Sequence, residues 1–415
     1  MSILILLFNT NFSYAEDLID SGILQNTENT TNDNLKIYSD AVILIENQTG
    51  KTLYEKNSEQ KMYPASTTKI LTAILSIEKG NLNDKVTVSK TAIAQMKPGY
   101  TSAYLSEGEI ISVEDLLKVL LINSANDASN VLAEYISGSI DSFVTWMNEK
   151  SKELGCTNTH FVTTNGLHDD NHYTTAKDLA IIARYCMQNS TFRHFVSQPE
   201  CQIAPTNKHA ARKFNNTNDL IRANSKYYYP YAIGIKTGFT KEAGNCLISA
   251  SKKDNLEVIS VVLNTGATAG RRCEDSIELF KYAYNNFGMK TLANKDDVIA
   301  QTVVKNGTKE TKNLDLTLSK DINALSMISE NDNEIEPVIN LKENISAPLA
   351  AGTVIGTVTY NVLGTEYTAD LVASHDVEKS ELLINILRIG LIALILIGLI
   401  ALILKFIRRK KKSGL

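Results

Sequence analysis

The chain reads YPASTTKILTAILSIEKG over residues 63–80, a stretch that joins a helical pattern to a serine–lysine pair. From Ile70 onward, apolar residues recur at i, i+1, i+4 and i+7, which is the spacing of one face of an α-helix. Gly80 stands where a C-terminal cap is expected. Ser66 and Lys69 lie three residues apart at the start of this helix, so we expect their side chains to share one face and to touch.

The segments around this helix alternate between strand and helix signals. Two hairpins are predicted from β-rich runs that flank turns, at residues 41–45 with 51–54 and at 245–250 with 256–263. Five further helices are predicted from apolar periodicity, at residues 113–121, 128–136, 140–154, 175–187 and about 274–286. Strands at both ends that enclose helices predict one mixed α/β (α+β) domain from about residue 36 to 290.

The C-terminal third differs from the rest of the chain in composition and in its predicted secondary structure. Residues 298–304 and 353–360 are β-rich and are punctuated by Asn-Gly and Gly turns, so we expect a small all-β, sandwich-like domain over 295–376. Residues 389–404 then form an uncharged run that spans about 24 Å as a helix, slightly less than a bilayer core of roughly 30 Å. With its flanks, this run predicts a transmembrane anchor over residues 386–407.

Both ends of the chain carry signals for membrane targeting. The basic segment 408–415 follows the apolar run and is expected on the cytoplasmic side, which places the bulk of the chain outside. A buried core helix or a helix lying on the membrane surface is the alternative, but the run has no polar face. At the other end, residues 1–15 resemble the end of a signal peptide without its basic region, and residues 16–35 form a polar leader expected to be flexible.

Composition excludes some functional classes. The chain has 42 basic and 46 acidic residues, a net charge of −4, and gives no sign of nucleic-acid binding. Five cysteines form no close pair and are expected to be mostly buried small hydrophobes. One bridge stays open as an alternative, because an exported protein meets oxidising conditions.

Three short motifs carry the chemistry, in the order Ser66-x-x-Lys69, Ser124-x-Asn126 and Lys236-Thr237-Gly238, with first residues 58 and 112 positions apart. A serine hydroxyl is a poor nucleophile until a base takes its proton. A lysine can act as that base once desolvation and a neighbouring cation lower its pKa. The lysine of the third motif can supply the cation.

The second and third motifs suit substrate handling. The Ser124–Asn126 segment is predicted to be a loop before a helix, where a hydroxyl can relay a proton and an amide can grip a peptide. Residues 232–235 predict an edge strand that can pair with an extended peptide, and Gly238 is expected to let the substrate approach closely. Taken alone, each motif has an ordinary interpretation: the first as a solvated helix face, the second as a turn or N-cap, and the third as a hairpin corner. Their joint occurrence on an exported, anchored chain favours catalysis.

The sequence resembles the low-molecular-mass penicillin-binding proteins, the serine-type D-Ala-D-Ala carboxypeptidases of the peptidase S11 type with a β-lactamase-like fold. The resemblance covers nearly the whole chain, because the family also has a C-terminal β domain and a membrane anchor. It rests on five runs, residues 63–69, 124–128, 165–167, 173–179 and 234–240.

The resemblance implies a role for each motif residue. Ser66 would be the acylated nucleophile, Lys69 the general base and Ser124 a proton relay. Asn126 would position the substrate and the base lysine. The oxyanion hole would consist of the backbone N–H groups of Ser66 and Phe239.

The remaining implied positions bind the substrate. Lys236 would orient the relay serine and bias the electric field, Thr237 would contact the terminal carboxylate, and Gly238 completes the motif. A family arginine that helps to hold the carboxylate corresponds best to Arg272, with Arg271 as the alternative.

The implied activity is removal of the terminal D-Ala from peptidoglycan stem pentapeptides. β-Lactams would acylate the same serine, and no cofactor or metal is required. The protein would be a single-pass protein of the cell membrane with its catalytic domain on the outer face. Ala125 departs from many relatives, which carry Gly there, and many relatives anchor through an amphipathic helix instead of a spanning one.

Three alternatives stay open. A DD-endopeptidase or transpeptidase could use the same serine. A β-lactamase usually carries Ser-Asp-Asn and a deacylating glutamate, whereas residue 125 is Ala and no clear equivalent glutamate stands out between residues 154 and 167. A catalytically silent peptidoglycan-binding protein would not need the intact motif residues.

Two other groups of residues are candidate sites. His168 and His172 flank two aspartates in one segment, a combination that can indicate a metal site, but without a third ligand cluster we interpret it as a solvated loop. The tyrosine-rich run 227–231 is interpreted as packing, with a sugar-binding platform as the alternative.

Overall fold

The computed structural model describes residues 35–94, 96–97, 99–329 and 335–412. The predicted signal-peptide remnant and the leader up to residue 34 lie outside this part of the chain.

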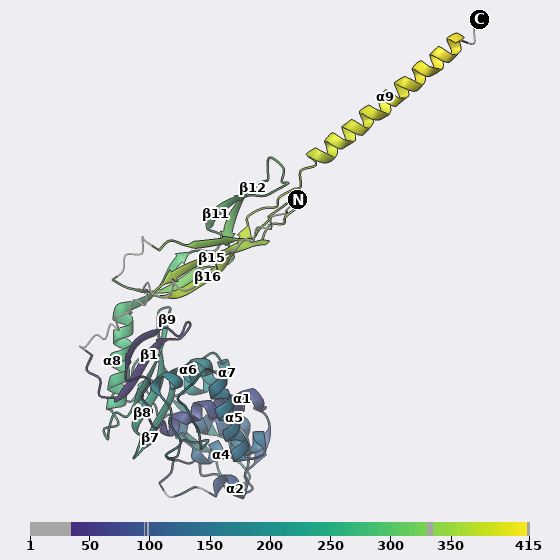
Figure 1. Ribbon diagram of the computed structural model, residues 1–415. Helices are drawn as coiled ribbons and strands as arrows, with labels where there is room; N and C mark the ends of the chain where they lie inside the picture. The colour runs from purple at the N-terminus through teal and green to yellow at the C-terminus, as the bar shows by residue number, and fades with distance from the viewer. Residues whose placement is uncertain (1–34, 95, 98, 330–334, 413–415) are drawn as a thin grey trace, which may run out of the picture. The chain divides into compact units, whose positions relative to one another are not determined.

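A five-stranded antiparallel sheet forms the centre of the N-terminal domain (Figure 1). Its strand order is β2 (Thr52–Lys56), β1 (Ala41–Glu46), β9 (Leu256–Leu263), β8 (Gly244–Lys253), β7 (Ala232–Thr240). Every residue of β1 and β9 is buried, because helices cover both faces of the sheet. Both predicted hairpins are confirmed, and β7 lies at the edge of the sheet as expected.

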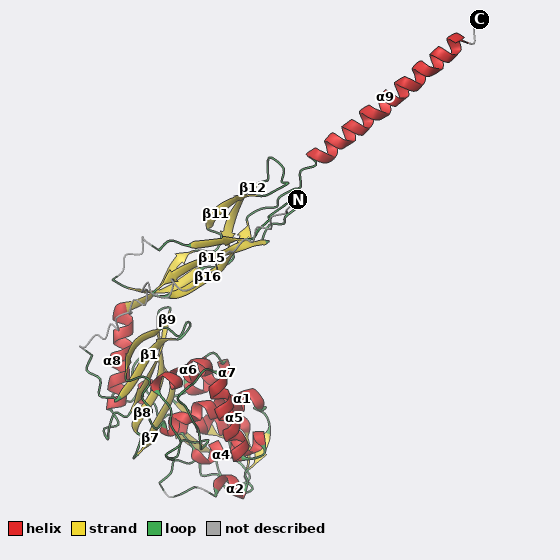
Figure 2. Ribbon diagram, in the orientation of Figure 1, coloured by secondary structure: helices red, strands yellow, loops and turns green. Residues whose placement is uncertain are grey.

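Helices pack on the two faces of this sheet (Figures 1 and 2). α8 (Arg271–Asn286) covers β8 and β9 on one face, and α6 (Ala176–Met187) packs on β1 and β9 from the other. Behind α6 lies a helical cluster built around α1 (Lys69–Lys79) and α4 (Asn126–Ser137). Its other helices are α2 (Lys90–Ile93), α3 (Val113–Lys118), α5 (Ile140–Glu153) and α7 (Ser190–Val196).

The predicted helices are present with small differences in their bounds. The segment predicted as one helix over 113–121 consists of α3 and a π-helical turn, η2 (Val119–Asn123). The short α7 was not predicted, although Asn189 caps it by accepting backbone N–H groups. Two small hairpins were also missed, β3 (Lys85–Thr87) with β4 (Ile110–Ser112) and β5 (Glu200–Ile203) with β6 (Arg212–Asn215).

Cysteines and tyrosines behave largely as the sequence indicated. All five cysteines are buried and unpaired, so the alternative of a disulfide bridge is not realised. In the tyrosine-rich run, Tyr229 stacks on Phe280 with ring centroids 5.7 Å apart, which confirms packing for this member.

The C-terminal part contains two antiparallel sheets. The elements are β10 (Phe287–Ala293), β11 (Val298–Val303), β12 (Asn313–Leu318), β13 (Ile322–Met327), β14 (Val338–Leu341), β15 (Val354–Val362) and β16 (Thr365–Ala373). Five strands pair in the order β11-β12-β16-β15-β14, and β10 pairs with β13. Alternate residues of β12 and β16, such as Leu316 and Leu371, are buried between the sheets, which gives the period-two pattern of a sandwich.

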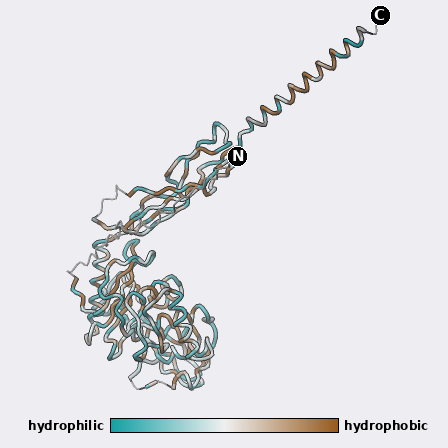
Figure 3. Tube along the Cα trace, viewed as in Figure 1, coloured by the Kyte–Doolittle hydropathy of each residue, from teal (hydrophilic) through white to brown (hydrophobic). Residues whose placement is uncertain are grey.

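The last element is the long helix α9 (Leu382–Lys412), whose 31 residues extend about 46 Å. Its segment Asn385–Arg409 is strongly apolar (Figure 3), with a mean hydropathy of 2.9 over its 18-residue window, and no residue of that window is buried. By length and composition this segment can cross a membrane, and it is longer than the uncharged run that predicted it.

Candidate active site

Ser66 lies on a single turn of 3₁₀ helix, η1 (Ala65–Thr68), directly before α1. The hydroxyl of Thr67 donates to the carbonyl of Pro64 at 2.7 Å, and that of Thr68 donates to the carbonyl of Ala65 at 2.9 Å. Ala65 has a φ of +48°, a left-handed conformation that is uncommon outside glycine and that these contacts hold in place. Ser66 is half-buried, whereas its neighbours on the turn are fully buried.

Lys69 is completely buried, and its amine contacts three oxygen atoms. The amine lies 2.8 Å from the Oγ of Ser66, 2.7 Å from the Oδ1 of Asn126 and 2.6 Å from the carbonyl oxygen of Asn165. The carbonyl oxygens of Asn126 and Asn165 can only accept, so they take two N–H groups. A neutral amine therefore directs its lone pair at the serine hydroxyl.

Burial and neighbouring cations favour this neutral form. Burial is the larger cause and the Lys236 ammonium the second, and together they hold the pKa of Lys69 well below its ordinary value, against the opposing charge of Asp127. Lys236 is also fully buried, and burial with the nearby Arg272 guanidinium lowers its pKa to about 7. With this pKa, Lys236 is only partly charged at neutral pH, and its role as the cation beside Lys69 stays a prediction.

The second motif sits where η2 gives way to α4. Ser124 has a φ of +67° at the end of η2 and is buried, and within the described part of the chain its hydroxyl makes no hydrogen bond. Asn126 is the first residue of α4. The buried carboxylate of Asp127 accepts the backbone N–H groups of Ala103 and Leu105 at 3.0 Å, and so fixes a neighbouring loop against the motif.

The third motif lies on edge strand β7 and packs against the serine turn. A Cβ atom at Gly238 would lie 2.9 Å from the carbonyl oxygen of Pro64 and 3.1 Å from the backbone nitrogen of Ser66. The backbone at Pro64 and Ser66 therefore explains why glycine stands here, and the expected close approach of a substrate stays a prediction. Thr237 donates its hydroxyl hydrogen to the Oγ1 of Thr217 at 2.6 Å.

The two candidate arginines face different neighbours. Arg272 donates to the Oδ1 of Asn245 at 3.3 Å, and Asn245 pairs with Phe239 across β7 and β8. The guanidinium of Arg271 instead lies over the ring of Tyr38, 4.5 Å from its centroid. The geometry therefore favours Arg272, beside the third motif.

Three contributors at the site were not assigned from the sequence. Asn165 holds Lys69 through its backbone carbonyl, and a backbone acceptor leaves no trace in side-chain motifs. Gly166 follows it, and its φ of +80° explains the glycine. Thr217 contacts the third motif from a segment that carried no recognised signal.

The histidine segment required a correction. His172 is buried, with 2% of its surface exposed, so the interpretation as a solvated loop is wrong for this residue, although His168 is exposed and lies 3.4 Å from the carboxylate of Asp170. Among the residues that the structure describes, no group of three metal-ligating side chains is assembled.

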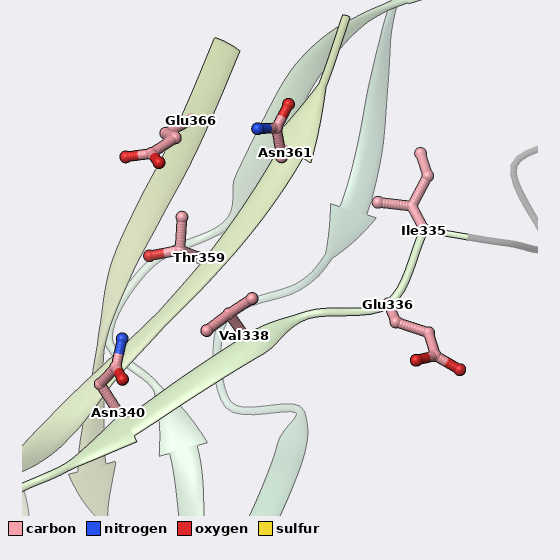
Figure 4. A pocket seen from close by; sticks show the side chains of 7 residues that line it. All are labelled: Ile335, Glu336, Val338, Asn340, Thr359, Asn361 and Glu366. Atoms are coloured by element: carbon pink, nitrogen blue, oxygen red, sulfur yellow. The ribbon is translucent and has the colours of Figure 1, made fainter. Parts of the chain in front are cut away.

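An open pocket of about 610 Å³ lies beside edge strand β14 (Figure 4). Its polar side chains are Glu336, Asn340, Thr359, Asn361 and Glu366, a set without a nucleophile–base pair. The serine–lysine pair of η1 and α1 is therefore the better candidate for catalysis.

Comparison with known proteins agrees with this geometry. The profile of the D-alanyl-D-alanine carboxypeptidase family matches residues 27–267. The chain is 35% identical over 343 residues to D-alanyl-D-alanine carboxypeptidase DacF of Bacillus subtilis (strain 168), an alignment that covers 81% of this chain and 85% of the relative. The chain belongs to the D-alanyl-D-alanine carboxypeptidase family.

The second domain and the solved structures extend this family assignment. Residues 287–379 match the C-terminal domain of penicillin-binding protein 5. Penicillin-binding protein 5 of Haemophilus influenzae superposes with a TM-score of 0.66 at 29% identity, over 83% of this chain and 99% of that one. A peptidoglycan synthesis regulatory factor (PBP3) of Streptococcus pneumoniae gives a TM-score of 0.72 at 25% identity, over 83% and 100%. The expected carboxypeptidase fold with its C-terminal β domain is thereby confirmed.

Proposed function

We propose that this member of the carboxypeptidase family removes the terminal D-alanine from peptidoglycan stem pentapeptides through an acyl-enzyme on Ser66. The observation that carries the proposal is the 2.8 Å contact between the Ser66 hydroxyl and a buried lysine amine whose two other partners are carbonyl oxygens. This arrangement provides a base where a serine nucleophile needs one.

The reaction proceeds in two acyl transfers. Lys69 takes the proton of Ser66 as the serine oxygen attacks the carbonyl carbon of the D-Ala-D-Ala peptide bond. The oxyanion that forms is held by the N–H groups of Ser66 and Phe239. The proton reaches the leaving D-alanine amine through Ser124, the C–N bond breaks, and water then hydrolyses the ester and restores the serine hydroxyl.

Substrate recognition is assigned to the surrounding motif residues. Asn126 uses its oxygen to hold the lysine, so its amide N–H₂ remains for a carbonyl of the stem peptide. Edge strand β7 can add the extended peptide as a further strand. The terminal carboxylate binds to Thr237 and Arg272, while Lys236 orients Ser124 and Gly238 keeps the strand against the serine turn.

β-Lactams are expected to acylate Ser66 as mimics of the peptide. We assign residues 36–290 to catalysis, 295–376 to the β domain, 386–407 to a membrane anchor and 408–415 to a cytoplasmic tail. The exposed apolar helix α9 supports the anchor. The enzyme would then act on the outer face of the cell membrane.

The test uses the full-length protein in detergent. Wild type should bind a fluorescent penicillin covalently and release free D-alanine from a pentapeptide, as detected by mass spectrometry. Ser66→Ala should do neither, and Ser374→Ala, an exposed serine of the β domain, should behave as wild type.

Other outcomes point to the alternatives. Failure of the wild type to label refutes the proposal. Rapid release of the bound penicillin indicates a β-lactamase, and formation of cross-linked peptides instead of free stem tetrapeptide indicates a transpeptidase.

A further inference from the structure

The buried imidazole of His172 is held in one tautomer. Its Nδ1 accepts the backbone N–H groups of Val162 at 3.0 Å and Thr163 at 3.2 Å. The ring is therefore neutral with its proton on Nε2. Burial is the largest cause that lowers the pKa of His172 to about 4, against the opposing charge of Asp169, in agreement with the neutral ring.

The Nε2–H group begins a chain of directed hydrogen bonds. It donates to the Oγ1 of Thr68 at 2.8 Å. Since this contact occupies the hydroxyl as an acceptor, the hydroxyl hydrogen is directed to the carbonyl oxygen of Ala65 at 2.9 Å. The histidine thus acts at a distance on the peptide group between Ala65 and Ser66.

That peptide group carries the N–H of Ser66, which the proposed mechanism uses to hold the oxyanion. A trans peptide is planar, and its C=O and N–H groups point in opposite directions, so fixing the carbonyl of Ala65 fixes the direction of the N–H. The fixation is needed because Ala65 has a φ of +48°. Gly166 confines the same carbonyl from a second side, since a Cβ there would lie 1.8 Å from it.

The other nitrogen of the ring reaches the lysine side of the site. Thr163, which donates to Nδ1, accepts the N–H of Gly166 through its Oγ1 at 3.0 Å. Asn165, which directly precedes Gly166, presents the carbonyl that binds Lys69 at 2.6 Å. One ring therefore links the serine turn to the loop that holds the base.

We propose that His172 is a positioning residue, which through Thr68 orients the oxyanion-binding N–H of Ser66 and through residues 162–163 supports the Asn165 carbonyl. This role rests on the proposed acylation of Ser66.

The experiment uses conservative variants of the full-length protein in detergent. Thr68→Val keeps the shape of the side chain but breaks the chain of hydrogen bonds, Thr68→Ser keeps the hydroxyl, and His172→Phe keeps a ring without nitrogens. The acylation rate constant and the dissociation constant of the preceding complex are measured with fluorescent penicillin. The carbonyl stretch of the acyl-enzyme is measured by difference infrared spectroscopy with a ¹³C-labelled penicillin.

Loss of one oxyanion-hole donor costs about 100- to 1,000-fold, so a misdirected donor in Thr68→Val should lower acylation by about 10- to 100-fold. The dissociation constant of the noncovalent penicillin complex that precedes acylation should stay within about threefold of the wild-type value, because the donor stabilises the transition state. The carbonyl band should move to higher wavenumber, which a purely structural defect would not cause. Thr68→Ser should retain both the rate and the band position.

The double variant decides whether the two residues act as one unit. The acylation rate constant of the double variant, His172→Phe with Thr68→Val, should lie within about threefold of that of the slower single variant. The reason is that each substitution breaks the same chain of hydrogen bonds. A Thr68→Val protein with the wild-type rate and band overturns the proposal, and so do multiplicative effects in the double variant. If His172→Phe does not fold, the two Thr68 variants decide alone. A wild type that does not label refutes the acyl-enzyme itself, which is a distinguishable result.

Discussion

Replacing Gly166 by alanine should inactivate the enzyme far more than it destabilises it. A methyl group at this position would lie 1.8 Å from the carbonyl oxygen of Ala65. Ordinary contacts begin near 3.4 Å, so the carbonyl must move by about 1.6 Å (3.4 minus 1.8). The serine N–H moves with it, because both belong to one rigid peptide group.

The size of the effect follows from this displacement. A misplacement of about 1 Å in an active site can cost about 100-fold in rate, so Gly166→Ala should acylate at least about 100-fold more slowly than wild type. The left-handed backbone adds a cost of about 1–2 kcal/mol to folding. We expect a folded protein with a melting temperature lowered by several degrees.

A matched control separates the clash from the backbone strain. Gly155 also has a positive φ, +88°, but a Cβ there meets no atom within 4 Å. Gly155→Ala should therefore lose stability and keep acylation within about twofold of wild type. Both variants are compared by the rate of fluorescent penicillin labelling and by thermal unfolding. A folded Gly166→Ala that labels at the wild-type rate, or a Gly155→Ala with an equal loss, would refute the reasoning.

Three further predictions concern charge and attachment. Lys69 must be neutral to accept a proton, and the Lys236 cation lowers the pKa of Lys69, so it raises the neutral fraction at a given pH. Lys236→Gln should therefore raise this pKa and move the acid limb of the acylation pH–rate profile to higher pH. An unmoved acid limb would count against this coupling. In D-alanine release assays, Arg272→Ala should raise KM for a pentapeptide with a free carboxylate by about 10-fold or more, as expected for loss of a charged hydrogen bond. Arg271→Ala should change this KM by less than about twofold. Equal effects of the two variants would contradict the choice of Arg272. A chain that ends at Ser380, before α9, should still label with penicillin but should not float with lipid vesicles, whereas the full chain should float. Flotation of the shortened chain would show that a second segment attaches the protein to the membrane.

Local patterns predicted the elements that carry the motifs. The apolar period in residues 70–77 predicted α1, and the β-rich runs around Gly50 and residues 252–255 predicted both hairpins, because these segments bury one consistent set of side chains. The bend between α3 and Ser124 escaped prediction. A π-helical turn has the same apolar composition as an α-helix, and the left-handed φ of Ser124 is imposed by its surroundings.

Features set by contacts between distant segments could not be predicted. Gly238 was expected to let a substrate approach, and its close contact with the chain segment at residue 64, which reaches it across the fold, was not predicted. His172 has a polar, loop-like sequence around it, and it is buried because Thr68 and the backbone of Val162 supply partners from elsewhere in the chain. Sequence periodicity reports the face of one element and contains no record of such partners.

The buried cysteines have a practical consequence for labelling. Burial raises the pKa of the Cys201, Cys246 and Cys273 thiols to about 11 and that of Cys156 to about 12, and it also raises the pKa of Cys186 well above its ordinary value. Maleimides attack thiolates, so the native enzyme should be nearly inert towards them at neutral pH. A single exposed thiol, introduced for example by Lys208→Cys, would then carry a dye or a spin label selectively, without removal of any natural cysteine.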